Sequence, residues 1–260
     1  MKAPLKYTLA LAGVTALAVA PAVNAATTST TISGFDPNTY FSGGVTAGID
    51  FDDGTSSNYP APTQPGFLSI PASNAKTYNV TTGGITFDID VSNANFGNQN
   101  RNRNNVNAGR IMNDFEQWYG GRATAGTPVE AKLTLTGLVA NTDYEISLFT
   151  YNVGSGQVTH SFYDGTSSAA PLITTFTTAG TQNNYATWTP GVVITANSGS
   201  SSQIDLTIQA SEFFNAGPAR FDSRLTLDGV SVIQGATIPE PSSTALLGLG
   251  GLALILRRRK

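Results

Sequence analysis

A strict alternation of apolar and polar residues constrains the fold of this chain more than any other feature. Residues 85–91 read Ile-Thr-Phe-Asp-Ile-Asp-Val, and residues 129–135 place an apolar side chain at every second position. Successive side chains point to opposite faces of a strand, so each segment gathers its apolar residues on one face. Both segments are therefore predicted to be half-buried β-strands.

Further short strands are predicted at regular spacing, separated by turns rich in Gly, Ser and Asn. Gly229 suggests a bulge in the last of them, and the prolines of residues 56–71 leave room there for an edge strand at most. About nine or ten short strands predict an all-β, jelly-roll-like β-sandwich. The further strands are expected at residues 45–51, 144–151, 157–163, 172–177, 185–188 together with 192–195, 204–208 and 225–233.

Three segments lack a strand pattern. The polar residues 26–31 are predicted to be a flexible lead-in. Residues 93–107 are dense in Asn and have no period, which predicts a long exposed loop. Apolar residues between 111 and 119 have rough helical spacing, which predicts a short helix or an aromatic-lined loop.

Residues 133–146 carry Leu-Thr-Leu-Thr-Gly-Leu and then Asn-Thr-Asp-Tyr-Glu-Ile. This order resembles the strand, turn and Tyr-bearing strand of fibronectin type III domains and galactose-binding-like jelly rolls. The length of the chain favours the jelly roll, because a fibronectin module needs only about 100 residues. Residues 225–232 also resemble the last strand of such jelly rolls, and the resemblance implies that the domain binds sugars.

The C-terminal tail, residues 238–260, has three parts in a fixed order. A Pro-Glu-Pro spacer precedes an apolar run over residues 244–256, and a basic cluster ends the chain. As a helix the run would be about 20 Å long, short of the roughly 30 Å hydrocarbon core of a bilayer. The terminal cations would keep the C-terminus on the cytoplasmic side. The spacer is Pro239, Glu240 and Pro241, and the cluster is Arg257, Arg258, Arg259 and Lys260.

The three parts together resemble the PEP-CTERM sorting signal of Gram-negative bacteria. The resemblance implies export, transient retention in the inner membrane, and processing near Pro239-Glu240-Pro241 by an exosortase, a membrane-embedded cysteine transpeptidase. The alternative interpretations are a plain C-terminal membrane anchor and a hydrophobic core helix. A core helix seldom ends in four cations at a chain terminus.

The N-terminus carries a second export signal. Residues 1–25 contain Lys2 and Lys6, an apolar stretch over residues 7–20, and small residues before Ala25. This pattern predicts a signal peptide that signal peptidase cuts after Ala25. The remaining residues 26–237 are then the β-sandwich domain, delivered to the cell envelope or cell surface.

Charge and cysteine content exclude several classes of function. Of the 14 Lys and Arg and 17 Asp and Glu residues, the two terminal signals contain six cations and one acid, so the mature part keeps 8 cations and 16 acids. Its net charge near −8 makes nucleic acid an unsuitable partner. The chain has no Cys, which excludes disulfides, thiolate nucleophiles and Cys-type metal sites.

The Asn- and Arg-rich loop is the first candidate for ligand binding. Asn and Arg offer planar hydrogen-bond donors that match sugar hydroxyls, and Trp118, Tyr119 and Trp188 could supply stacking faces. An exposed loop that binds nothing is the alternative. The candidate ligand-binding residues are Asn100, Arg101, Asn102, Arg103 and Trp118, with extracellular polysaccharide as the ligand.

A calcium site is a second candidate. Asp50, Asp52 and Asp53 precede Gly54 and could supply hard oxygen ligands. Turn formation explains these residues equally well. Asp222 and Asp228 could complete the site only if the first and last strands are neighbours, and no other cofactor is indicated.

Catalytic residues are scarce. His160, the single His, alternates with Val158 and Phe162, which predicts a packed structural histidine. Asp114 and Glu116 could form a carboxylate pair for glycoside cleavage only on a strand, where acids two apart share a face. We therefore expect a non-enzymatic structural or carbohydrate-binding surface module, with a secreted polysaccharide-acting hydrolase as the alternative.

Overall fold

The computed structural model describes the β-rich body of the chain. It covers residues 27–52, 64–71, 75–92, 96–97, 116–119, 128–150, 156–177, 189–215 and 224–235. Almost all regular structure within these ranges is β-strand, and the exception is the one-turn helix α1 (Pro37–Tyr40). The signal peptide and the sorting tail predicted from the sequence lie outside the described residues.

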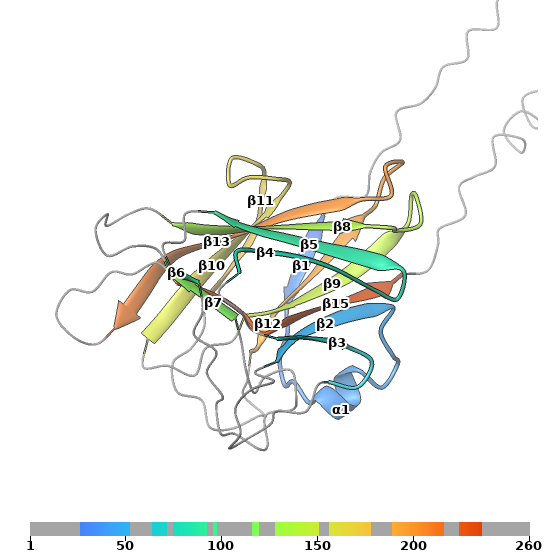
Figure 1. The fold of residues 1–260 in the computed structure, drawn as a ribbon, viewed down its shortest axis with the longest axis horizontal. Helices are drawn as coiled ribbons and strands as arrows, with labels where there is room; N and C mark the ends of the chain where they lie inside the picture. Colours follow the sequence, from blue (N-terminus) through green and yellow to red (C-terminus); the bar gives the residue numbers. More distant parts are fainter. Residues whose placement is uncertain are drawn as a thin grey trace, which may run out of the picture.

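Two six-stranded sheets form the body (Figure 1). Sheet A has the order β1-β12-β9-β15-β2-β3, with bounds Thr28–Thr31, Gly191–Asn197, Asp143–Phe149, Gly229–Gln234, Ala47–Asp52 and Leu68–Pro71. Sheet B has the order β11-β10-β13-β8-β5-β4, with bounds Leu172–Thr177, Gly156–Asp164, Ile204–Asn215, Val129–Thr136, Ile85–Ser92 and Thr77–Thr82. Neighbouring strands are antiparallel except for β2 and the edge strand β3, which are parallel.

The strand order is that of a jelly roll with added edge strands. Taken in chain order, β2, β8, β9, β10, β11, β12, β13 and β15 give β2-β15-β9-β12 in sheet A and β8-β13-β10-β11 in sheet B. Among these eight strands the chain changes sheet after every strand that has a successor except β10, as two Greek keys require. β1 and β3 extend sheet A, and β5 and β4 extend sheet B. The predicted jelly-roll-like β-sandwich is thereby confirmed.

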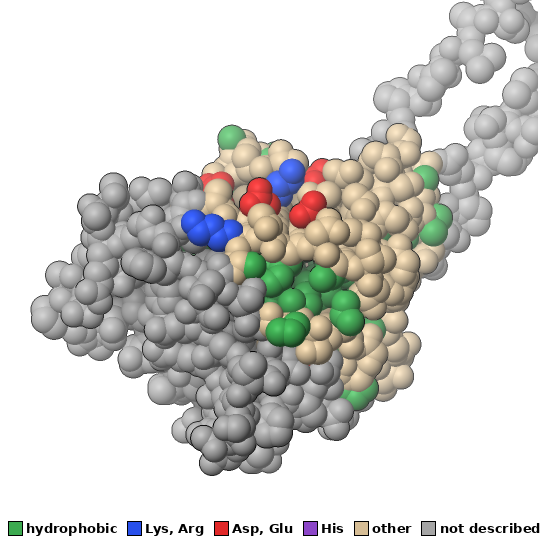
Figure 2. Space-filling model, viewed as in Figure 1, with side chains coloured by type: hydrophobic (Ala, Val, Ile, Leu, Met, Phe, Trp, Pro, Cys, Tyr) green, Lys and Arg blue, Asp and Glu red, His purple; other side chains and the backbone are tan. Residues whose placement is uncertain are grey.

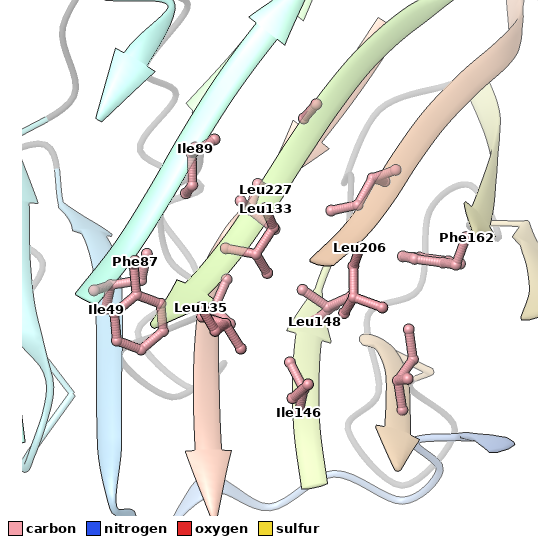
Figure 3. Packing of buried hydrophobic residues seen from close by; sticks show 14 of the residues in the cluster. Ile49, Phe87, Ile89, Leu133, Leu135, Ile146, Leu148, Phe162, Leu206 and Leu227 are labelled. Carbon is pink, nitrogen blue, oxygen red and sulfur yellow. The ribbon is translucent and has the colours of Figure 1, made fainter. Parts of the chain in front are cut away.

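The core lies between the two sheets (Figure 3). The burial patterns of β5 and β8 alternate strictly, with Ile85, Phe87, Ile89 and Val91 buried on one face of β5. Residues from sheet A, such as Ile49, Ile146 and Leu148, point into the same core (Figure 3). A chain without cysteine therefore obtains its stability from apolar burial between the layers.

A short third sheet, sheet C, corrects two predictions. It has the order β14-β7-β6, with bounds Arg224–Leu227, Glu116–Tyr119 and Phe96–Gly97. Residues 116–119 are thus a strand instead of the predicted helix or loop, and residues 96–97 of the predicted exposed loop also pair. The predicted bulge at Gly229 is wrong as well, because the chain leaves sheet C at Asp228 and enters sheet A.

An N-terminal strap, residues 27–46, covers the outer face of sheet A. The predicted flexible lead-in is wrong, because Thr28–Thr31 pairs with β12 as the edge strand β1. The strap then packs Phe35, Tyr40 and Phe41 against Phe149 of β9, with ring centroids 5.4–6.1 Å apart. The ring of Phe41 also contacts that of Phe67, with centroids 5.0 Å apart. Phe67 lies directly over Gly48 of β2, where a Cβ would come within 2.5 Å of the Phe67 ring.

Tyr40 joins the strap to the sheet. Its hydroxyl lies 2.9 Å from Ser147 Oγ on the outer face of β9. Burial raises the pKa of Tyr40 above its ordinary 10.0, so the hydroxyl keeps its proton at neutral pH. Both faces of β9 are therefore covered near its end.

The two ends of the sandwich differ in their connections. At the turn end, short described turns join the strands at residues 82–85, 137–142 and 197–203. The other end is the loop end. The residues that flank the long connections lie there, among them Asp52, Ser92, Thr150, Thr177, Asn215 and Arg224.

Candidate functional site

Strand β14 closes the loop end from inside the sandwich. Leu225 and Leu227 belong to the main core, and Thr226 between them is also fully buried. Thr226 Oγ1 donates to the main-chain O of Thr150, which follows β9 of sheet A (3.2 Å). The main-chain N of Thr226 donates to His160 Nε2 on β10 of sheet B (3.4 Å). Both large sheets therefore hold β14 in place.

The candidate ligand-binding loop is attached to this buried strand. β7 pairs with β14, and β6 pairs antiparallel with β7, with Gly97 opposite Trp118. The segment with Asn100, Arg101, Asn102 and Arg103 connects β6 to β7 and lies outside the described residues. Of the predicted binding residues, the structure places Trp118 alone, with its backbone opposite Leu225.

The predicted calcium ligands are only partly placed. Asp50 lies on β2 and is 1% exposed, and its Oδ2 atom accepts a hydrogen bond from the main-chain N of Gln64 (2.7 Å). This bond fixes the start of the 64–71 segment, which is a structural role. Asp52 ends β2, and Asp53 lies outside the described residues.

The strand that carries Asp50, β2, and the strand that follows Asp228, β15, are neighbours in sheet A, as a shared calcium site would need. Asp50 lies opposite Gly229 in the register of β2 and β15. Asp228 precedes Gly229, so strand alternation assigns Asp50 and Asp228 to opposite faces of the sheet. Within the described part of the chain, no three His, Asp or Glu side chains come together in a way that could hold a metal ion.

His160 is a buried structural residue, as its alternation with Val158 and Phe162 predicted. All three side chains are 0% exposed. Burial lowers the pKa of His160 to about 3, so the imidazole is neutral at physiological pH. Because Nε2 accepts the bond from Thr226, the ring proton lies on Nδ1. A neutral ring inside the core has no access to a substrate.

The outer face of sheet B is polar and carries both signs of charge (Figure 2). Asp88 and Asp90 on β5 are exposed, and Asp90 lies opposite Lys132 of β8. Glu130 accepts hydrogen bonds from Ser168 Oγ (2.5 Å) and from Gln209 Nε2 (2.8 Å). Glu130 is thereby hydrogen-bonded within the face, and the exposed acids beside it are those of an ordinary solvated sheet surface.

The sequence did not mark β14 as part of the site. Its Leu-Thr-Leu alternation predicts one buried face, whereas Leu225, Thr226 and Leu227 are all buried. The absence of charge over residues 225–227 is the one local signal that could have indicated this. The aromatic strap was missed too, although Asp36-Pro37 is a common helix start.

Residues 237–260 match the PEP-CTERM protein-sorting motif. The chain therefore carries this sorting signal, as the order of its Pro-Glu-Pro spacer, apolar run and basic cluster predicted. A motif of this kind indicates an exported protein that is sorted to the envelope of a Gram-negative bacterium. The match covers the tail and leaves the sandwich unassigned.

Several solved structures are similar to the sandwich. A family 35 carbohydrate binding module from Clostridium thermocellum has 13% identity and a TM-score of 0.32, over 56% of this chain and 92% of the module. CBM32 of AlyQ, in complex with 4,5-unsaturated mannuronic acid, has 12% identity and a TM-score of 0.28, over 55% and 92%. TmCBM61, in complex with β-1,4-galactotriose, has 10% identity and a TM-score of 0.30, over 56% and 88%.

These TM-scores lie below 0.5, so the fold assignment rests on the strand order of the chain itself. No curated protein matches the sequence. Within the described residues, no helix is long and apolar enough to cross a membrane.

Proposed function

We propose that this chain is a cell-envelope protein delivered by two successive processing steps. Signal peptidase removes residues 1–25 during export, and the tail then holds the protein transiently at the inner membrane. An exosortase-type transpeptidase cuts near Pro239-Glu240-Pro241. The match of residues 237–260 to the sorting motif supports this route.

The sandwich acts as a non-enzymatic module that binds extracellular polysaccharide, with Asn100, Arg101, Asn102, Arg103 and Trp118 as its contacts. The attachment of the β6–β7 hairpin to the buried strand β14 carries this proposal. A recognition loop binds more tightly when its two ends are fixed, because less conformational entropy is lost on binding. Asp50, Asp52 and Asp53 remain candidate calcium ligands in this proposal.

A hydrolase is disfavoured by the position of the single histidine. His160 is neutral and fully buried, so it cannot serve as a general base. Glu116 lies at the start of β7, and it remains the carboxylate to test for hydrolysis together with Asp114.

Affinity electrophoresis in gels that contain acidic or neutral polysaccharides tests the binding proposal. The double variant Arg101→Ala/Arg103→Ala removes two charged donors and is expected to bind at least about 10-fold more weakly, since a lost charged hydrogen bond costs about 1.5 kcal/mol or more. The matched control Lys76→Ala/Lys132→Ala removes the same charge from sheet B and its edge and should bind like the wild type.

Two outcomes would contradict the proposal that the sandwich is a binding module. If the polysaccharide gel retards both double variants to the same extent, the protein either does not bind the polysaccharide or binds it through unspecific electrostatic attraction. Release of reducing ends by the wild type, lost in Glu116→Gln, would instead establish the hydrolase.

A further inference from the structure

Both ends of the described chain leave the sandwich on the same side. The strand register places Thr28 of β1 opposite Thr195, Thr195 opposite Glu145, and Glu145 opposite Ile233 of β15. The beginning of the first strand and the end of the last strand therefore lie in one row of sheet A. Three strand spacings of about 4.8 Å separate them by about 14 Å. Both export signals thus connect to the turn end.

The turn end carries few charges and one exposed apolar side chain. Val139, at the tip of the β8–β9 turn, is 52% exposed. On the face seen in Figure 2, this right-hand end shows neither acidic nor basic side chains. The segments that build it contain no Asp, Glu, Lys or Arg: residues 41–46, 82–85, 137–142, 197–203 and 234–235.

Acids at the base of these turns are already engaged. Asp143 accepts a hydrogen bond from Asn197 Nδ2 (2.6 Å), and Asp164 accepts one from Thr27 Oγ1 (2.6 Å). Asp205 accepts hydrogen bonds from Thr134 and Gln203 (2.7 Å each). Glu145 of β9, in the row of Thr195 and Ile233, is an exposed acid just beyond the turns. The turn segments themselves consist of Gly, uncharged polar, aliphatic and aromatic residues.

Hydrogen bonds make the turn end a fixed surface. The β8–β9 and β12–β13 turns are joined by Asn141 N to Gly199 O (2.7 Å) and by Ser198 Oγ to Val139 O (2.6 Å). The last described residue, Gly235, donates its N–H to Asp143 O (2.8 Å). The point at which the sorting tail begins is therefore held firmly against these turns.

The tether between sandwich and apolar run is short. Eight residues, 236–243, separate Gly235 from the run that starts at residue 244, and they span at most about 28 Å. The six residues of β15 alone are about 20 Å long. An inverted domain, with its loop end at the bilayer, would need this tether almost fully extended along the side of the sandwich.

Electrostatics favours the same orientation. The mature part is acidic, and acidic surfaces are repelled by anionic lipid headgroups. An uncharged end meets neither this repulsion nor the cost of desolvating ionised side chains. The turn end is the surface of the described sandwich that combines low charge with the point at which the tail begins.

We propose that the turn end is the membrane-facing surface of the protein while its tail is retained in the bilayer. Val139 then lies at the lipid headgroups, and the loop end with sheet C points away from the membrane. The proposal rests on the retention step of the proposed function. It assigns the orientation in which the candidate ligand-binding loop is displayed.

The chain has no Cys, so single cysteines can be labelled selectively. The full chain is produced in a Gram-negative host without an exosortase, so that it keeps its tail, and is reconstituted in anionic lipid vesicles. A fluorophore is attached at Val139→Cys or at the matched control Ser92→Cys, an exposed site at the loop end. Quenching by lipids with headgroup nitroxides is then measured, after flotation has established that the protein is bound to the vesicles.

Strong quenching at Val139→Cys, at least about threefold above that at Ser92→Cys, is the expected result, because a nitroxide quenches only a fluorophore that comes close to it and the loop end lies a whole strand length away from the turn end. Equal quenching at both sites, or stronger quenching at Ser92→Cys, in protein that floats with the vesicles would overturn the orientation. Failure to float would overturn membrane retention itself, and the orientation with it.

Discussion

The imidazole of His160 lies wholly inside the sandwich, between Val158 and Phe162 on β10. Its pKa is lowered by burial from 6.5 to about 3. Below pH 6.5 the unfolded chain binds a proton that the folded chain excludes. The contribution of the neutral imidazole to the free energy of unfolding is therefore complete above pH 6.5. This contribution decreases as the pH falls toward 3.

We expect the free energy of unfolding to decrease by about 2 kcal/mol between pH 8 and pH 5 through this residue alone, since each pH unit below 6.5 costs about 1.4 kcal/mol. His160→Gln does not titrate and keeps an acceptor for the N–H of Thr226. Urea unfolding at pH 8, 6.5 and 5 should therefore show a shallower pH dependence for the variant. Parallel curves for the two proteins would mean that His160 is protonated in the folded state.

At the scale of elements, the packing of the N-terminal strap against the outer face of sheet A stabilises the domain. Phe35 is 1% exposed, and its ring lies 5.2–5.9 Å from those of Tyr40, Phe41 and Phe149. Replacing it by Ala leaves a cavity on the outer face of the sheet. We expect Phe35→Ala to lower the free energy of unfolding by about 3 kcal/mol.

The matched control for this change is Val139→Ala, because Val139 is exposed and its truncation should cost less than about 0.5 kcal/mol. Thermal or urea unfolding compares the two variants. If Phe35→Ala is no more destabilising than the control, the strap is not a stable part of the domain.

Strands with one buried face could be predicted from their alternation, and an edge strand with no buried face could not. β5 and β8 alternate strictly because sheet B has solvent on its outer side. β1 is an edge strand with almost fully exposed residues, so it carries no apolar period. Residues 225–227 of β14 lie within the strand predicted at residues 225–233, but the burial of Thr226 together with Leu225 and Leu227 was not predicted. The pairing of β14 with β7 joins segments more than 100 residues apart. No local pattern encodes such a contact.

At the scale of the whole molecule, the jelly-roll class could be predicted from the number and spacing of its strands. The connection of both termini to one end could not, because it depends on which strands become neighbours in sheet A. The candidate loop was likewise predicted only as a polar segment. Its attachment to the buried strand β14 is a tertiary contact.

The tail and the sandwich together predict how the protein is processed. In the tail, four residues separate the end of β15 at Gln234 from the Pro-Glu-Pro spacer. Two prolines stiffen such a spacer, which would present it to a membrane-embedded enzyme while the sandwich stays outside. We expect the protein purified from its native envelope to lack the residues that follow the cleavage point near Pro239. Glu240→Ala should instead keep Arg257 to Lys260, and intact-mass spectrometry distinguishes the two forms.

Glu145→Ala is the matched control, because it removes an exposed acid of β9 from the folded domain and leaves the tail unchanged. It should be processed like the wild type, since a protease-like enzyme reads the extended spacer and not the sheet surface. If the wild type, the control and Glu240→Ala all retain Lys260, the tail acts as a simple anchor. Loss of the tail from all three would show that cleavage does not depend on the acid between the two prolines.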